Sequence, residues 1–561
     1  MKQENFVNLI SFCRELNFTG KRIRNSKLEV IEQALQALDL TQYDAAKLVD
    51  DIQAYFEDEK SKLEQAKQKA SNKKSADTVE GSTVAADLPV LAGDRFIVTC
   101  AQNNTVPTEA LAQLEALADH IEAQLIILPA FYNKHHFSQA VEDENEYFDP
   151  AIEPHLLLDD CWLFGVNEVR LCAEAAIGFT NKMPVNGAQQ LNAGELMTIV
   201  GNPRQQYRTL PRLGFNDRIR KAWSTGAVTG YNYTRSGAGS KAEKTHKFGG
   251  VIVWRDDDNI INSTNIRQGS LNSMMVYFGG TKCLKVNDKA QVSEVLASDN
   301  VAVKLGDLHC EKKDAEQWHN ALNLVCNLNP RFVAIDDVAH FESRSHHQRN
   351  NVIHDYKHRN SEVQNEVKTV IDDINELSYQ IDGTVYITES NHNAAVDIWL
   401  SHPSSGDDAI NSKFYHLASY LLRDAIDHGA TGETALALEA VMLNSDLTGL
   451  PELASNIEFG RATIPYVGFE YDFSQHGDKG ANGARGNVVE FDRWKLKLVT
   501  GHTHSPSIIN DVFTTGVTGK LNQGYNAKGA SNWDHAHVIE HCNGECQLFN
   551  TNPQKMLVTS N

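Results

Sequence analysis

Five short blocks of candidate metal ligands follow one another in the C-terminal half of the chain. Aspartate, histidine and asparagine supply their ligand atoms, and cysteine supplies none. Such a donor set suits hard or borderline divalent ions rather than a thiolate zinc site. The blocks are Gly306-Asp307-Leu308-His309, Asp336-Asp337, Ser390-Asn391-His392, His476-Gly477-Asp478 and Gly501-His502-Thr503-His504.

Apolar runs of the β type precede these blocks, so the sequence predicts a strand-to-loop corner at each of them. The run 301–305 leads to Asp307, and the run 332–335 leads to Asp337. The 30 residues between the two aspartates match one strand–helix–strand crossover, which implies parallel strands. Because open α/β sheets hold their sites at the carboxyl ends of the strands, we expect the ligands to meet there.

The ordered set of blocks resembles the calcineurin-like metallophosphoesterase superfamily, whose pattern is D-x-H, G-D, G-N-H, H and G-H-x-H. The spacings from Asp307 through Asp337, Asn391, His476 and His502 are 30, 54, 85 and 26 residues. The resemblance covers about residues 300–550. It implies an α/β protein whose C-terminal part is an αββα-type sandwich.

The resemblance also implies a pair of divalent ions, with Mn²⁺ as the first choice and Mg²⁺ or another divalent ion as the alternative. Two ions about 3.5–4 Å apart activate a water and stabilise charge on phosphoryl oxygens. Asp337, rather than Asp336, would bridge the ions, because the ligand is the second residue of the G-D motif. The other ligands of the first ion would be Asp307, His309 and His504. The other ligands of the second ion would be Asn391, His476 and His502.

His392 is the candidate catalytic residue, because the resemblance assigns it the role of a general acid or of an imidazole that contacts the phosphate. The family often pairs this histidine with a later aspartate of its second motif, and this chain has His340 there. Ser390 replaces the usual glycine of the third motif. Phe341-Glu342 stands where protein Ser/Thr phosphatases continue with Arg-Gly, which disfavours that activity.

Positive charge is concentrated in two stretches of an otherwise acidic chain. The net charge of −21 argues against a general affinity for nucleic acid. Between Arg204 and Lys247, however, ten basic residues stand against two acidic ones, a local charge of +8. The glycine-rich loop 477–486 adds two more cations, which suits a passing phosphate backbone. A solvated basic surface and a flexible turn are the alternatives. The candidate substrate contacts are Lys479, Arg485 and His340.

The chain is expected to contain four parts. They are a helical unit at 1–56, a charged linker at 57–90, an α/β accessory domain at 91–298 and the metallophosphoesterase domain at 299–561. In the first part, the capping-box pattern Ser26-Lys27-Leu28-Glu29 predicts a helix start. The accessory domain opens with a strand–helix–strand motif, and the apolar runs 250–254 and 274–278 would extend its sheet.

Histidines and cysteines outside the five blocks carry weaker signals. Those near the C-terminus fall on a predicted β-hairpin with an Asn-Gly turn, and their spacing is not that of a zinc finger, so we expect no zinc there. They are His535, His537, His541, Cys542 and Cys546. Another set lines either the substrate channel or a solvated helix face, and it comprises His346, His347, His354 and His358.

The composition favours a cytoplasmic protein without a membrane partner. The nine cysteines are scattered and odd in number, which fits reduced thiols. No run of eighteen apolar residues is present, and the N-terminus lacks the apolar core of a signal peptide. We also expect a homo-oligomer.

The layout of the chain and the loop His-Gly-Asp-Lys-Gly-Ala-Asn-Gly-Ala-Arg-Gly resemble the early DNA-degrading proteins of large tailed phages. This resemblance implies a metal-dependent DNase that has DNA as its partner and acts in the host cytoplasm. A phosphodiesterase or phosphatase for nucleotides or small esters is the alternative with the same chemistry. A non-catalytic takeover or binding protein with a structural metal centre is the alternative of another class.

Overall fold

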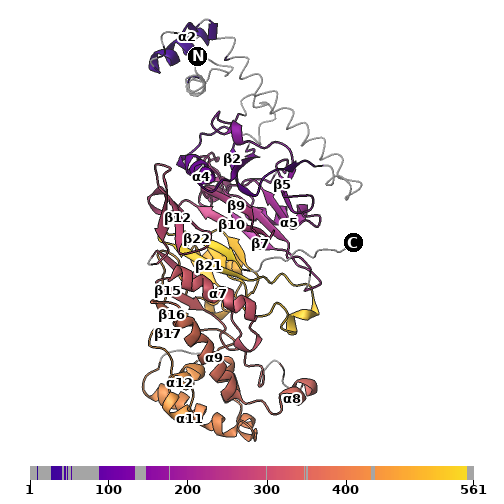
Figure 1. Cartoon of the computed structure of the whole chain (residues 1–561), viewed down its shortest axis with the longest axis vertical. Coiled ribbons are helices and arrows are strands. Elements are labelled where there is room, and N and C mark those ends of the chain that lie inside the picture. Colours follow the sequence, from indigo (N-terminus) through magenta and orange to yellow (C-terminus); the bar gives the residue numbers. More distant parts are fainter. Residues whose placement is uncertain are drawn as a thin grey trace. The chain divides into compact units, whose positions relative to one another are not determined.

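The computed structural model of the chain describes residues 88–132 and 147–551, apart from 176, 216, 299, 346–347, 349–350 and 431–435 (Figure 1). Nearer the N-terminus it describes 27–38 and the positions 9, 40, 43–45, 47, 48 and 52. Helix α2 (Lys27–Ala37) begins where the capping-box pattern predicts a helix. Most of the rest of the predicted helical unit, and the linker as far as residue 87, lie outside the described residues.

Two compact units share the chain, and the sequence passes between them several times. Unit 1 comprises 1–205, 222–255 and 288–290, and unit 2 comprises 206–221, 256–287 and 291–561. The chain combines helices with several mixed sheets, so it is a mixed α/β protein as expected. Among the described residues, no helix has the length and apolar character that a membrane crossing needs.

Unit 1 is built on the predicted strand–helix–strand motif. Strands β2 (Arg95–Gln102) and β3 (Gln124–Ala130) are parallel, α4 (Glu109–His120) connects them, and β9 (Gly249–Arg255) pairs antiparallel with β2. Thr108 caps α4, because its side chain accepts the backbone N–H of Ala110. The remaining elements are β1 (Val90–Leu91), β4 (Cys161–Leu163), β5 (Val169–Cys172), α5 (Pro184–Leu191), β6 (Met197–Val200), β8 (Lys221–Ser224, which starts in the last residue of segment 206–221) and α6 (Gly237–Glu243).

Unit 2 contains a six-stranded sheet in the order β17-β16-β15-β14-β21-β22. Its parallel strands are β14 (Val301–Lys304), β15 (Phe332–Ile335), β16 (Thr384–Thr388) and β17 (Ile457–Gly460). β21 (Ala536–His541) and β22 (Cys546–Asn550) complete it as the predicted antiparallel hairpin. The parallel strands therefore direct their carboxyl ends to one edge of the sheet.

Two helices provide the crossovers between the first three parallel strands. Helix α7 (Ala315–Leu328) joins β14 to β15, and α9 (Val363–Ser378) joins β15 to β16 (Figure 1). Asp314 caps α7 by accepting the N–H groups of Glu316 and Gln317, and Asn329 ends it in the left-handed conformation. The apolar faces of both helices share one buried core with the strands, and this packing holds the strand ends in place relative to one another.

A second group of paired strands in unit 2 carries the last ligand block. β18 (Leu498–Thr500) is parallel to β20 (Val512–Thr514), and β19 (Ser507–Ile509) is antiparallel to both β20 and β7 (Gln206–Thr209). Unit 2 also contains β10 (Ile261–Arg267), α8 (Val352–His358), α10 (Ala395–Leu400), α11 (Ser412–Asp427), α12 (Leu436–Met442), α13 (Ser445–Thr448) and α14 (Val488–Trp494).

The expectation that the run 274–278 extends the sheet of β2 was wrong. β11 (Met274–Tyr277) pairs antiparallel with β12 (Lys282–Val286), and β12 pairs with β13 (Val292–Leu296), in a three-stranded sheet. Gly279 and Gly280 both have positive φ angles, 127° and 75°, which a glycine adopts at little cost. A local hairpin therefore forms in preference to a distant pairing.

Candidate metal centre

Four of the five ligand blocks lie where strands of unit 2 end. The expectation of such a corner was wrong for the His476 block, which lies in a loop well after the end of β17. Asp307 and His309 follow β14, Asp337 follows β15, and Asn391 follows β16. The first two loops continue side by side after their strands, because the N–H groups of Leu308 and His309 donate to the carbonyl oxygens of Asp336 and Asp337 at 3.2 and 2.7 Å. The shared sheet edge thus brings side chains together that are 30 or more residues apart.

Six of the seven predicted ligands converge in two groups, and within each group the ligand atoms lie within 4.8 Å of one another. One group is Asp307, His309, Asp337 and His504, and the other is Asp337, His476 and His502. Asn391 joins the second group, since its Oδ1 lies 3.0 Å from both His476 Nε2 and His502 Nδ1. Asp337 belongs to both groups, which is the position that a bridging carboxylate requires.

The arrangement of these atoms fits a pair of cations. His309 Nε2 and His504 Nε2 face each other at 3.0 Å, and His504 Nε2 lies 2.9 Å from Asp307 Oδ2. Asp307 Oδ1 and His504 Nδ1 are buried without a hydrogen-bond partner among the described residues. Burial and the neighbouring imidazoles hold the pKa of His309 well below its usual value, so its ring is uncharged and one of its nitrogens has a lone pair for a metal. The buried clusters could bind metal ions, whose identity the donor set does not fix.

The backbone of the centre is strained at the ligands themselves. His309, Asp337, His502 and His504 have φ angles of 50°, 44°, 68° and 54°. Residues other than glycine rarely adopt positive φ, and such outliers concentrate at functional sites. Gly501 precedes His502 for a steric reason, because a Cβ atom there would clash with the carboxylates of Asp307 and Asp336.

Asp336 has partners of another kind, which the sequence did not reveal. Its Oδ2 lies 2.9 Å from Lys304 Nζ and 3.1 Å from His476 Nδ1. Burial alone would raise the pKa of Asp336, but Lys304 and His476 outweigh it and lower the pKa. The carboxylate therefore orients His476 from behind, leaving His476 Nε2 toward Asp337 at 3.3 Å. The only local signal was a lysine at the end of an otherwise apolar strand, β14.

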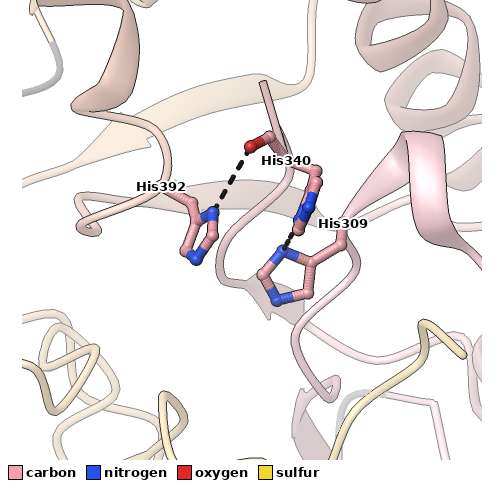
Figure 2. Close-up of side chains that lie close together, drawn as sticks. All are labelled: His309, His340 and His392. Carbon is pink, nitrogen blue, oxygen red and sulfur yellow. Dashed lines mark hydrogen bonds between the residues drawn. The ribbon is translucent and has the colours of Figure 1, made fainter. Parts of the chain in front are cut away.

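His392 lies beside His309 and His340, as Figure 2 shows, and among the described residues no carboxylate forms a hydrogen bond with its ring. Its Nδ1 faces the carbonyl oxygen of His340 at 3.4 Å, and its backbone N–H donates to Asp337 Oδ1 at 3.1 Å. Burial lowers the pKa of His392 to about 4, against the opposing effect of Asp337. The His340 ring stacks on the His392 ring at 5.2 Å between centroids and is itself buried.

The predicted substrate cations of the glycine-rich loop lie together near His476. Lys479 and Arg485 form an isolated antiparallel bridge, so the loop is a small hairpin. Both side chains are exposed, and Lys479 Nζ lies 3.5 Å from Asp478 Oδ2. Their contact with substrate stays a prediction, as does that of His340.

Part of the basic stretch 204–247 does not form a charged surface. In unit 1, Arg204 is buried and donates to Thr245 Oγ1 and the carbonyl oxygen of Asn181 at 2.9 and 2.7 Å. In unit 2, Arg212 and Lys221 are also buried. These cations are used in the interior of their units and are inaccessible to a DNA backbone.

The histidines at and just before the C-terminal hairpin have hydrogen bonds within the protein. His535 Nδ1 lies 2.6 Å from the carbonyl oxygen of Val517, and His541 Nε2 lies 3.0 Å from Gln547 Oε1. His537 Nδ1 accepts the N–H of Gly306 at 3.0 Å and so supports the turn before Asp307. Of the channel histidines, His346 and His347 lie outside the described residues, and His354 and His358 form a group with Glu342.

Comparisons with known proteins give one match of note. No protein-family model matches the chain, and no solved structure matches it. Protein A1 of Escherichia phage T5 is 29% identical over 574 aligned residues, which cover 96% of this chain and 97% of the phage protein. The chain is therefore a homologue of this phage protein, as its resemblance to proteins of large tailed phages predicted, and its His/Asp clusters are consistent with a metallophosphoesterase.

Proposed function

We propose that the chain is a metal-dependent phosphodiesterase that degrades DNA. The observation that carries the proposal is the pair of ligand groups that share Asp337, with His392 directly beside them. One shared carboxylate between two sets of imidazole and carboxylate ligands is the arrangement that two-metal hydrolysis requires. The αββα sandwich, in which the six-stranded sheet packs against the strands around β18, is part of the same proposal, as is the four-part division of the chain.

The residues that would hold the ions follow from the two groups. Asp307, His309, Asp337 and His504 would bind one ion, and Asp337, Asn391, His476 and His502 would bind the other. Mn²⁺ or Mg²⁺ bound there would supply an activated water and stabilise charge on the phosphoryl oxygens. Lys304 and Asp336 would hold His476 in the orientation that this binding needs.

His392 would act on the leaving oxygen or on a phosphoryl oxygen. A carbonyl oxygen accepts but does not donate, so the proton between His392 and His340 belongs on His392 Nδ1. This bond fixes the ring and leaves Nε2 as the nitrogen that carries or receives a proton at the substrate. The backbone hydrogen bond to Asp337 sets the distance of the ring from the shared carboxylate.

DNA is the substrate that the surroundings of the centre favour. The exposed hairpin with Lys479 and Arg485 begins within three residues of His476, where cations can hold a phosphate backbone in an otherwise acidic protein. The similarity to a T5 phage protein supports a role early in infection, when host DNA would be degraded in the host cytoplasm. We further propose that the protein works as a homo-oligomer.

The test is hydrolysis by the purified full-length chain with Mn²⁺, with Mg²⁺ and with EDTA. Cleavage of both bis(p-nitrophenyl) phosphate and plasmid or linear DNA, lost in Asp337→Asn, is the expected result. Cleavage of the small ester alone would replace DNA by nucleotides or small esters as substrate. Absence of both activities in a metal-loaded protein would overturn the proposal in favour of a binding protein with a structural metal centre.

A further inference from the structure

A chain of hydrogen bonds enters the centre from a carboxylate outside the ligand groups. Glu342 Oε2 lies 2.8 Å from His340 Nε2. His340 Nδ1 lies 3.3 Å from His309 Nδ1 (Figure 2). The far nitrogen of His309, Nε2, faces the shared ligand group, 3.9 Å from Asp337 Oδ2. His309 is fully buried and His340 nearly so, which shields the hydrogen bond between the two imidazoles from water.

The two hydrogen bonds that link Glu342, His340 and His309 allow one assignment of donors and acceptors when both imidazoles are uncharged. A carboxylate only accepts, so the proton of His340 is on Nε2 and its Nδ1 carries a lone pair. His309 must then donate from its Nδ1, which leaves a lone pair on His309 Nε2 toward Asp337. The opposite tautomer of His309 would place a proton on the nitrogen that has to bind the metal.

We propose that Glu342 and His340 are positioning residues that fix the tautomer and ring orientation of His309 and so present its Nε2 to the metal centre. The proposal rests on the proposed metal centre and extends it to two residues that supply no ligand atom to either group sharing Asp337. Metal-binding histidines generally donate their other N–H to a fixed acceptor, and here that acceptor is an imidazole held in turn by a carboxylate.

The pair is anchored from several sides. Glu311 accepts the backbone N–H groups of His340 and Phe341 at 2.7 and 3.0 Å, and Lys312 Nζ lies 3.0 Å from Glu342 Oε1. Burial works against ionisation of Glu342, but its bonds to His340 and Lys312 outweigh it and lower its pKa to about 2. Glu342 is therefore an ionised acceptor that Lys312 and His340 contact from two sides.

This arrangement explains the departure of the chain from the family pattern. The aspartate that usually pairs with the catalytic histidine is His340 here, and the nearby carboxylate is two residues further on, at Glu342. The His392 ring faces the carbonyl oxygen of His340, whereas Nδ1 of the His340 ring faces His309. The negative charge of Glu342 thus supports a metal ligand rather than the catalytic imidazole.

A rival role for Glu342 is a third metal site. Its ligand atoms and those of His354 and His358 lie within 4.8 Å of one another. The cation Lys312 at 3.0 Å from Glu342 Oε1 disfavours a divalent ion there, and His354 Nε2 is bonded to the backbone oxygen of Glu342 at 2.8 Å. The test has to separate this role from the positioning role.

The experiment measures Mn²⁺ affinity and stoichiometry by titration calorimetry of the metal-free full-length protein. We expect Glu342→Ala and His340→Ala each to weaken one of two ions about 10–100-fold, the range for loss of a partner behind a ligand. The double variant should lose no more than either single variant, because both residues act through His309. His358→Ala, which touches the other side of Glu342, is the matched control and should bind two ions as the wild type does.

Each outcome has a definite meaning. Wild-type affinity in Glu342→Ala, or additive losses in the double variant, would overturn the positioning role while leaving the metal centre intact. A stoichiometry that falls from three to two in Glu342→Ala and in His358→Ala would assign Glu342 to a third metal site instead. A wild-type protein that binds no ion would refute the metal centre itself. If Glu342→Ala does not fold, Glu342→Gln replaces it, and the same reduced affinity is expected because an amide can reverse the hydrogen bond to His340.

Discussion

Asp336 and Asp337 are neighbours in sequence, but their side chains have different partners. Replacing each of them by asparagine should therefore separate an effect on stability from an effect on metal binding. Asp336 is the anionic partner of the buried Lys304 and accepts from His476 Nδ1. Asp337 supplies an oxygen to both ligand groups. We expect Asp336→Asn to reduce mainly the stability of the metal-free protein and Asp337→Asn to reduce mainly metal binding.

The magnitudes follow from the burial and the partners of each carboxylate. Removing one partner of a buried ion pair costs about 3–5 kcal/mol. Lys304 keeps hydrogen bonds to the carbonyl oxygens of Phe473 and Gln475 at 3.0 and 3.2 Å, so Asp336→Asn should cost about 3 kcal/mol. Asp337→Asn leaves this ion pair intact, and its amide oxygen can still accept from the N–H of His392, so a loss of about 1 kcal/mol is expected.

Metal affinity should show the reverse order. Asp336→Asn acts only through the orientation of His476, so we expect it to lower the metal affinity about 10–100-fold. Asp337→Asn removes the one carboxylate common to both groups, so its loss should exceed about 100-fold, or about 2.7 kcal/mol, for at least one ion. Both variants are measured by urea denaturation in EDTA and by Mn²⁺ titration calorimetry. An Asp337→Asn protein that binds two ions like the wild type, beside an Asp336→Asn protein that binds none, would show that Asp336 is the bridge.

Three further variants test the catalytic imidazole, a buried carboxyl group and the exposed hairpin. His392→Ala should keep both ions but lower kcat about 10²–10⁴-fold, as measured by metal content and ester hydrolysis, and an equal loss of metal would make it a ligand. Burial, reinforced by the negative charge of Glu311, raises the pKa of Glu366 from 4.5 to about 8. Between these two pH values the Glu366 carboxyl group is protonated in the native protein and ionised in the unfolded chain. Wild-type stability should therefore fall relative to Glu366→Gln as pH rises from 5 to 7, by up to about 1.4 kcal/mol per pH unit in urea denaturation, and parallel curves would contradict the shift. Replacing Lys479 and Arg485 by alanine should flatten the plot of log duplex-DNA affinity against log salt by about 0.9 per lost contact, measured by fluorescence anisotropy in EDTA. Lys495→Ala is the exposed control, and an unchanged slope in the double variant would place the hairpin outside the DNA path.

The strand ends and the meeting of the ligands could be predicted because both follow from local patterns. Strands β14, β15 and β16 end directly before their blocks, and short apolar runs flanked by polar residues are sufficient to predict that. Parallel crossovers then place the blocks at one edge. His476 is different, because a long loop separates it from β17, and only the order of the family motifs indicated its place.

Residues whose role depends on tertiary contacts could not be predicted in this way. Counting charges between Arg204 and Lys247 treats neighbours in sequence as one surface, whereas Arg204, Arg212 and Lys221 are buried. Lys304 likewise reads as an exposed strand end, but it is the buried partner of Asp336. Such residues acquire partners from segments more than 20 positions away, which no local pattern records.

Hydrogen bonds between ligand-bearing corners accompany the strained backbone of the centre. Each positive φ at a residue other than glycine costs on the order of 1–3 kcal/mol and persists only where the surrounding contacts determine it. Those contacts are present here, because His309 donates its N–H to the carbonyl oxygen of Asp337 at 2.7 Å and His502 donates its N–H to Asp307 Oδ2 at 2.9 Å. The corners of Asp307, Asp337 and His502 are thus joined to one another by hydrogen bonds. Because the packed sheet edge holds the backbone and buried partners hold the rings, a mutation behind a ligand can weaken metal binding without touching the ion.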